Sequence, residues 1–245
     1  MFPIRDHNPS GRTPYAVYAL LAANILMYLG TLGLMSGGEA TYYFLFDWAI
    51  IPGRISEGQG YETLVTSLFL HGGILHLGGN MLFLWIFGDN LEDELGHLKF
   101  LAFYLACGIA AGLIHVLASP GSMVPTIGAS GAIAGILGGY LLLFPKARVD
   151  VLIILIVFFR VFAIPAWIML AVWLAFQLVG GFGSDPDAGG VAYWAHVGGF
   201  VAGLGLTLPL WLKLGGPDFW KRTHGHPPHP EHAYSPSRIP RIPRE

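Results

Sequence analysis

Residues 128–144 read GASGAIAGILGGYLLLF, an apolar stretch without an acidic or basic residue. Its only serine, Ser130, lies between small residues near the start of the stretch. This pattern predicts a helix within a membrane, and the small neighbours would let a substrate backbone come close to the hydroxyl. Ser130 is therefore a candidate nucleophile. Gly131, Gly135 and Gly139 recur every four residues, a spacing that lets two membrane helices pack closely.

Five further stretches are apolar and long enough to cross about 30 Å of hydrocarbon. The chain of 245 residues is 54% hydrophobic and 11% charged, whereas soluble domains carry about 25% charged residues. We therefore expect an all-α polytopic membrane bundle with six spans. The expected spans are residues 15–35, 66–88, 98–118, 127–144, 163–181 and 191–213.

The segments outside the six spans differ in composition. Residues 1–14 contain no short apolar region followed by a small-residue cleavage site, so we expect a cytoplasmic N-terminal segment rather than a cleaved signal peptide. The aromatic-rich connection 36–65 is expected to lie in the membrane interface. Residues 150–162 are expected to form a loop or a half-embedded piece, although they could also extend the fifth span. Residues 214–245, rich in proline and histidine, are expected to form a disordered cytoplasmic tail.

The distribution of basic residues predicts the orientation of the bundle. With six spans both termini lie on one side, and that side also carries most of the basic residues. They include Arg5, Arg12, Lys99, Lys146, Arg148 and Arg160, whereas the opposite side has Arg54 alone. We therefore expect cytoplasmic termini in a cell membrane, either a plasma membrane or an inner membrane. The formal net charge of −2 gives no indication of a nucleic-acid partner.

Four polar residues converge at one depth under this topology. They are His76 and Asn80 of the second span, Ser130 of the fourth and His196 of the sixth. All four fall in the outer halves of their spans. Next to the histidine of the sixth span lies a second stripe of small residues, at Ala195, Gly199 and Gly203. Packing the two stripes together would bring the hydroxyl and the imidazole towards hydrogen-bond distance.

These residues could perform nucleophilic catalysis. A serine hydroxyl needs a general base to take its proton, and His196 is the candidate because histidine titrates near neutrality. The oxyanion formed from the attacked carbonyl needs preorganised donors. The candidate donors are His76, Asn80 and the backbone N–H of Ser130. No aspartate or glutamate lies at matching depth, so a Ser-His dyad fits better than a triad.

Several segments resemble the rhomboid family of intramembrane serine proteases. They are HGGILHLGGN (71–80), MLFLWIFGDNLEDELG (81–96), GASGAIAG (128–135) and AHVGGFVAG (195–203). The resemblance covers residues 15–213 and implies a six-span catalytic domain over that range. It also implies an endopeptidase that uses no metal or organic cofactor. Such an enzyme cleaves transmembrane helices of membrane-protein substrates near their outer ends, in an active site that opens to the outer side of the lipid bilayer.

The resemblance implies a role for each site residue. Ser130 would be the nucleophile and His196 the general base, while His76, Asn80 and the Ser130 N–H would form the oxyanion site. The family's Gly-x-Ser-Gly motif is matched by Gly128 and Gly131, and the motif of the sixth span is supported by Gly199.

Two departures from the family pattern matter for the site. Some members place a tyrosine four residues after the serine, where this chain has Ala134, so another group must orient His196. Asp185 and Asp187 precede the sixth span, but they are expected to be solvated loop residues. Some members also carry a Trp-Arg pair in the first outer loop, and this chain has none there. The remaining histidines near the outer surface, His71 and His115, are expected to be interface residues.

Two other functions compete with proteolysis. A catalytically silent rhomboid-like protein would bind membrane clients and would need neither Ser130 nor His196, yet both are present. A transporter or channel would need a relay of ionisable residues through the membrane, and the six spans contain no such relay.

Overall fold

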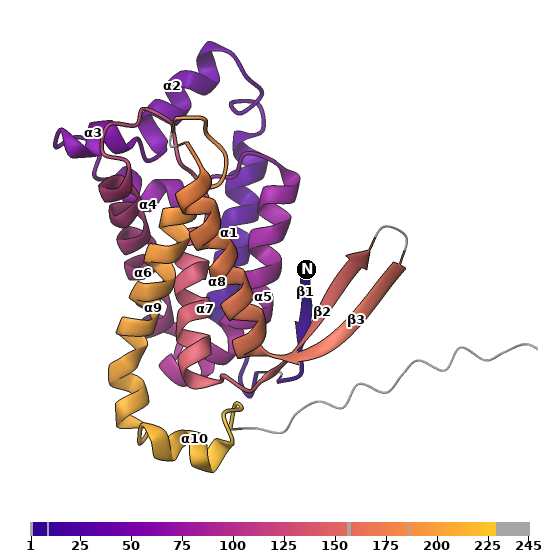
Figure 1. Ribbon diagram of the computed structural model, residues 1–245. Coiled ribbons are helices and arrows are strands. Elements are labelled where there is room, and N and C mark those ends of the chain that lie inside the picture. Colours follow the sequence, from indigo (N-terminus) through magenta and orange to yellow (C-terminus); the bar gives the residue numbers. More distant parts are fainter. Residues whose placement is uncertain (1, 9, 156–157, 186, 229–245) are drawn as a thin grey trace, which may run out of the picture.

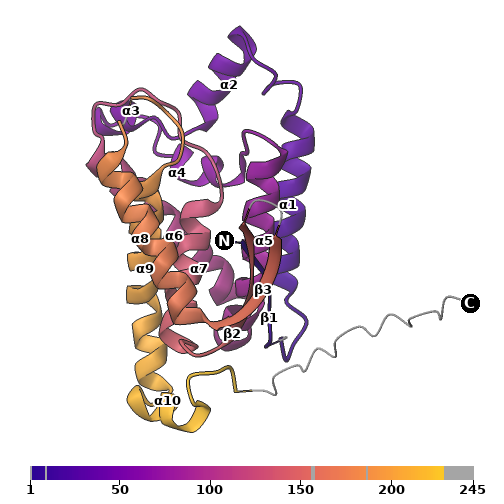
Figure 2. The same cartoon turned by 45° about the vertical axis from the view of Figure 1, so that its right-hand side comes forward.

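The computed structural model describes residues 2–8, 10–155, 158–185 and 187–228 (Figure 1). Within these ranges, each of the six expected spans overlaps one long helix, and the helix of the second span runs over 74–95 instead of the expected 66–88. These helices are α1 (Tyr15–Thr31), α5 (Ile74–Leu95), α6 (His97–Ala118), α7 (Ser130–Leu143), α8 (Ala166–Gly183) and α9 (Tyr193–Lys213). Helix α7 lies at the centre of the bundle, as Figures 1 and 2 show from two directions. Most of its residues are buried.

Only part of this bundle meets the length and composition of a membrane span. Helices α6, α8 and α9 do so, and α5 forms a fourth candidate together with Thr63–Phe69, from which it is bent by 96°. Helices α1 and α7 are apolar but shorter, with 17 and 14 residues. At 1.5 Å per residue, α7 is about 21 Å long and falls short of the hydrocarbon thickness. The chain is thus a mostly helical polytopic membrane protein with three to four candidate spans.

The connection between the first two bundle helices is itself helical. It contains α2 (Glu39–Trp48), α3 (Pro52–Ser56), α4 (Thr63–Thr66) and the 3₁₀ turn η1 (Ser67–Phe69). These short elements gather at one end of the bundle (Figure 1). A small apolar cluster holds α3 and α4 against α6, and its members are Ile50, Ile55, Leu64 and Val116.

The expectation of an all-α fold is wrong in one region. Strands β1 (Phe2–Asp6), β2 (Arg148–Leu155) and β3 (Phe158–Pro165) form an antiparallel sheet in the order β1-β2-β3. The residues expected to form a loop or an extension of the fifth span therefore belong to a hairpin that projects beside the bundle (Figure 1). Its sequence is rich in valine, isoleucine and phenylalanine, which favour strands.

Asp150 fastens the N-terminal strand to this hairpin. Its carboxylate accepts hydrogen bonds from Arg5 Nε at 2.6 Å and from the His7 ring at 2.8 Å. Burial alone would raise the pKa of Asp150, but the hydrogen bonds from His7 and Arg5 outweigh burial and hold the pKa below its usual value. Stability from this carboxylate is therefore present at neutral pH and is lost as the pH falls through its lowered pKa.

The expected disordered tail is also partly helical. Pro217–Thr223 form α10, which begins with proline at its first helical position. The indole of Trp220 donates a hydrogen bond to the Leu142 carbonyl at 2.9 Å and packs on Trp211, with ring centroids 4.8 Å apart. These contacts hold α10 against the end of α7. The tail histidines His229 and His232 lie outside the described residues.

Glu92 joins the first turn of α1 to the last turns of α5. Its carboxylate oxygens accept hydrogen bonds from the backbone N–H groups of Ala16 and Val17, at 2.9 and 2.8 Å, and it also bonds to the His97 ring. The side chain is 2% exposed. Two N–H groups that have no partner within α1 are thereby satisfied by a buried acid.

Helices α7 and α9 meet backbone to backbone, as the two glycine stripes predict. A methyl group at Gly199 would overlap the carbonyl oxygen of Gly131, and one at Gly203 would overlap the carbonyl oxygen of Gly135. Neither position has room for any side chain. Close approach of these two helices is therefore a property of the glycines themselves.

We expect Gly199→Val to destabilise the bundle because the valine would have to push α9 away from α7. Overpacking of this kind costs about 1–3 kcal/mol, or more where backbone is the obstacle. Thermal unfolding of the detergent-solubilised protein should show a lower midpoint. Gly205→Ala on the same helix is the matched control, since an added methyl group there has nothing within 4 Å. Equal midpoints for the two variants would contradict the packing argument.

Candidate active site

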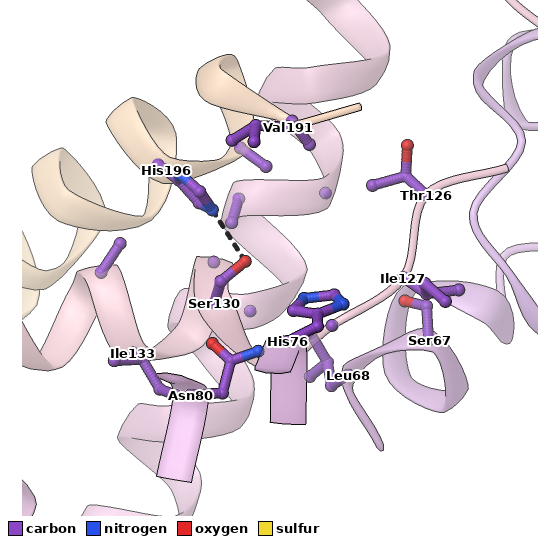
Figure 3. A pocket seen from close by; sticks show the side chains of 18 of the residues that line it. Ser67, Leu68, His76, Asn80, Thr126, Ile127, Ser130, Ile133, Val191 and His196 are labelled. Carbon is purple, nitrogen blue, oxygen red and sulfur yellow. Dashed lines mark hydrogen bonds between the residues drawn. The ribbon is translucent and has the colours of Figure 1, made fainter. Parts of the chain in front are cut away.

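Ser130 and His196 meet where α7 and α9 begin. Ser130 is the first residue of α7, and His196 lies in the first turn of α9. The distance from Ser130 Oγ to His196 Nε2 is 2.7 Å, a hydrogen bond (Figure 3). The close contact of the two helices therefore brings together the hydroxyl and imidazole that the sequence placed at one depth.

The other ring nitrogen of His196 is held by Gln177 of α8. His196 Nδ1 lies 2.8 Å from Gln177 Oε1, while Gln177 Nε2 donates to the Trp173 carbonyl at 3.1 Å. Because the amide nitrogen is engaged by a carbonyl, the amide oxygen faces the imidazole and must accept from Nδ1–H. His196 Nε2 then carries the lone pair, and the Ser130 hydroxyl donates to it.

Gln177 was not among the residues singled out from the sequence. One signal was available, because it is the only amide or charged side chain in the expected span 163–181. Polar groups within membrane helices are costly and often functional. In the structure, this amide lies beside His196 Nδ1. Asp185 and Asp187 are exposed in the loop before α9, where the backbone N–H of Asp187 donates to the Asp185 side chain.

His76 and Asn80 project from α5 towards the same hollow as Ser130 and His196 (Figure 3). Gly128 lies against both, because a methyl group there would be 2.7 Å from His76 Nε2 and 3.7 Å from Asn80 Nδ2. The φ angle of Gly128 is +125°, which side-chain-bearing residues rarely adopt. Glycine is thus required at this position for two independent reasons.

Asn80 Nδ2 is a buried donor without an acceptor. The side chain is 7% exposed, and among the described residues no protein atom accepts a hydrogen bond from its amide nitrogen. Unsatisfied buried donors are uncommon and call for an explanation. The backbone N–H of Ser130 is comparable, since the first N–H groups of a helix have no partner within it. Both donors lie beside the nucleophile candidate.

These groups line a cavity of about 600 Å³. Its polar lining includes Ser67, His76, Asn80, Thr126, Ser130 and His196. One water occupies about 30 Å³ in the liquid, so the cavity has room for a peptide segment together with water. Trp173 of α8 closes one side, with its ring centroid 5.8 Å from that of His196.

The two neighbouring histidines support the walls of this cavity. His71 is buried and its ring lies edge-on to His76, with centroids 5.0 Å apart, so its side chain packs inside the protein. The His115 ring lies 3.0 Å from Thr126 Oγ1 in a hydrogen bond that fixes the loop before Ser130.

The chain is similar to proteins of one family. The family model of the Rhomboid domain matches residues 58–213. "Rhomboid protein 1, mitochondrial" of Saccharomyces cerevisiae is 32% identical in an alignment of 198 residues that covers 77% of this chain and 51% of the relative. "Rhomboid protease GluP" of Bacillus subtilis is 32% identical over 197 residues, which are 80% of this chain and 36% of the relative.

A third relative extends the similarity to another lineage. "Rhomboid-like protease 3" of Toxoplasma gondii is 33% identical over 162 residues, covering 62% of this chain and 56% of the relative. The chain spans between about a third and a little over half of the length of these three relatives. The matched range contains α5 to α9, and with them Ser130, His196, His76, Asn80 and Gln177. By these similarities the chain belongs to the rhomboid family of proteases.

Proposed function

We propose that this chain is an intramembrane serine endopeptidase that cleaves transmembrane segments of membrane proteins. The observation that carries the proposal is the 2.7 Å hydrogen bond between Ser130 and His196, in which Gln177 turns the lone pair of His196 Nε2 towards the hydroxyl. A relative from Bacillus subtilis is named a rhomboid protease. The cavity, the unpaired Asn80 amide and this hydrogen bond together match the requirements of acyl transfer.

The proposed reaction has two halves. His196 Nε2 takes the proton of Ser130 as Oγ attacks the peptide carbonyl, and the resulting imidazolium gives that proton to the leaving amine. An acyl-enzyme on Ser130 remains. Water then attacks it while His196 Nε2 takes a proton from the water. The second tetrahedral intermediate collapses as the imidazolium returns that proton to Ser130 Oγ, and the new carboxyl terminus leaves. The oxyanion in both halves accepts hydrogen bonds from the Ser130 N–H, Asn80 Nδ2 and His76.

Gln177 has a positioning role in this proposal. A neutral amide fixes the imidazole ring and its tautomer, as the aspartate of a triad does, but it cannot neutralise the imidazolium. Ala134, at the place where some family members carry a tyrosine, is buried without a polar group. Support for His196 therefore comes from α8 instead of α7.

The finer architecture is part of the same proposal. We place six spans in residues 15–213, with α1 and α7 completing the four candidate spans, and cytoplasmic segments at 1–14 and 214–245. The basic residues favour cytoplasmic termini in a cell membrane and an active site in the outer half of the bilayer. Substrates would then be cut near the outer ends of their transmembrane helices.

We expect Ser130→Ala and His196→Ala each to reduce cleavage of a transmembrane substrate by more than about 10³-fold, since neither residue can act alone. A fluorophosphonate probe should label the wild-type protein but not Ser130→Ala. Ser67→Ala is the matched control because Ser67 is a second serine of the same cavity (Figure 3). Equal labelling of the wild type and Ser130→Ala would reject the nucleophile.

Asn80→Ala should lower kcat by about 10²-fold, the cost of removing one oxyanion donor. Activity should remain measurable because His76 and the Ser130 N–H can still donate. Kinetics on a purified substrate in detergent or nanodiscs would give kcat and KM separately. Unchanged turnover would mean that Asn80 Nδ2 is unpaired for some other reason.

Gln177→Leu should lower kcat by about 10²-fold, towards the low end of what general-base catalysis contributes, because the leucine cannot accept from His196 Nδ1–H. KM should change little, and Gln177→Glu should restore turnover by supplying an acceptor oxygen at the same place. A purely structural role would instead lower the thermal midpoint of both variants and change KM with kcat. That outcome would remove Gln177 from the mechanism.

A further inference from the structure

A second cavity lies at the other end of α5, remote from Ser130. Its volume is about 540 Å³, and it is formed by the N-terminal segment together with α1 and α5. The residues used below are Arg5, Asp6, Arg12, Tyr18, Trp85 and Asp89. Thirteen residues of helix separate Asp89 from His76, or about 20 Å at 1.5 Å per residue. This cavity is therefore at the opposite membrane face from the proposed active site.

The cavity presents charges of both signs. Arg12 is exposed, and its guanidinium forms no ion pair with any described residue, although Glu94 is near enough to interact electrostatically. Arg5 is 46% exposed while its Nε binds Asp150. Asp89 is half-buried, and one of its oxygens has only a long contact, 3.3 Å from the Ser10 N–H. Arg12 and Asp89 thus have hydrogen-bonding capacity that the protein does not use fully.

One acid of the cavity carries little charge. Asp6 is buried, and its carboxyl contacts the Tyr140 hydroxyl at 3.2 Å. Burial, and then the negative charge of Asp89, raise the pKa of Asp6 to about 8, so Asp6 is mostly neutral at pH 7. The charge of Arg5 is balanced by Asp150. What remains for a ligand is the guanidinium of Arg12, which donates hydrogen bonds, and the carboxyl of Asp89, which accepts them, and the two together match a zwitterion rather than a simple anion.

An aromatic pair marks the lipid side of this cavity. The rings of Tyr18 in α1 and Trp85 in α5 stack with centroids 5.8 Å apart, and they are 42% and 55% exposed. Trp85 is four residues before Asp89, so both lie on one face of α5. Exposed tryptophan and tyrosine are typical of the boundary between headgroups and hydrocarbon. A molecule in the cavity would therefore have one end at the depth of lipid headgroups.

We propose that this cavity binds the headgroup of an aminophospholipid, with the phosphate at Arg12 and the primary ammonium at Asp89. Guanidinium groups suit phosphate because they donate from a planar fork. A primary ammonium has three N–H donors for the carboxylate, whereas a quaternary choline has none. Acyl chains would pass Tyr18 and Trp85 into the bilayer. The same chemistry exists in soluble phosphorylethanolamine, and the aromatic pair favours the lipid.

The test uses the full chain, delipidated in detergent and titrated with dioleoyl phosphatidylethanolamine, phosphatidylcholine or phosphatidylglycerol, with bound lipid counted by native mass spectrometry. We expect the ethanolamine lipid to bind at least about tenfold more tightly than the other two, the value of one good charged hydrogen bond. Arg12→Gln should lower the affinity for the ethanolamine lipid about tenfold. Lys99→Gln, which removes an exposed charge elsewhere on the same side, should not.

Asp89→Asn should abolish the preference for ethanolamine over choline. If that variant does not fold, the comparison of Arg12→Gln with Lys99→Gln decides. Equal affinity for the three lipids, or equal losses in those two variants, would overturn the proposal. Displacement of the lipid by equimolar phosphorylethanolamine would assign the site to a soluble ligand instead. Ser130→Ala should bind lipid like the wild type, so failure of the proposed proteolysis and failure of this site are distinguishable.

Discussion

The backbone contact between α7 and α9 is the constraint on which the proposed active site depends. Gly199 faces the carbonyl oxygen of Gly131 with no space for a methyl group. Gly131 is one residue from Ser130, and Gly199 is three residues from His196. The helix separation that these glycines set therefore also sets the Ser130–His196 distance. Lipid chains supply no hydrophobic driving force between helices, and close packing must hold them instead. The short length of α7 fits this role, because a helix buried on all sides is positioned by its neighbours.

Three elements then divide the chemistry of the site among them. Helix α7 supplies the hydroxyl and an unpaired N–H, α9 the imidazole, and α5 two further donors. The donors on α5, His76 and Asn80, lie near the start of that helix. Near its other end, buried Glu92 fastens α5 to α1. A site built on helices in this way keeps its geometry without substrate, as preorganised catalysis requires.

The sequence predicted the helices and their contacts wherever a local pattern of residues determines the structure. Apolar length located all six bundle helices, and the spacing of Gly131, Gly135, Gly199 and Gly203 predicted which faces would meet. The prediction failed where a segment pairs with another segment that is distant along the chain. The pairing of β1 with β2 joins residues about 145 positions apart, so the apolar run 150–162 could not be separated from a membrane segment by its own composition.

The amide of Gln177 was overlooked for a related reason. Its position in the fifth span was visible, but its partner on α9 depends on the tilt of α8, which no residue pattern specifies. The contact between Gln177 and His196 also has a physical consequence. Because α8 carries the group that holds His196 Nδ1, the position of this helix sets the orientation of the imidazole. In the proposed enzyme, alignment of the general base therefore depends on one hydrogen bond between α8 and α9, in addition to the contact of α9 with α7.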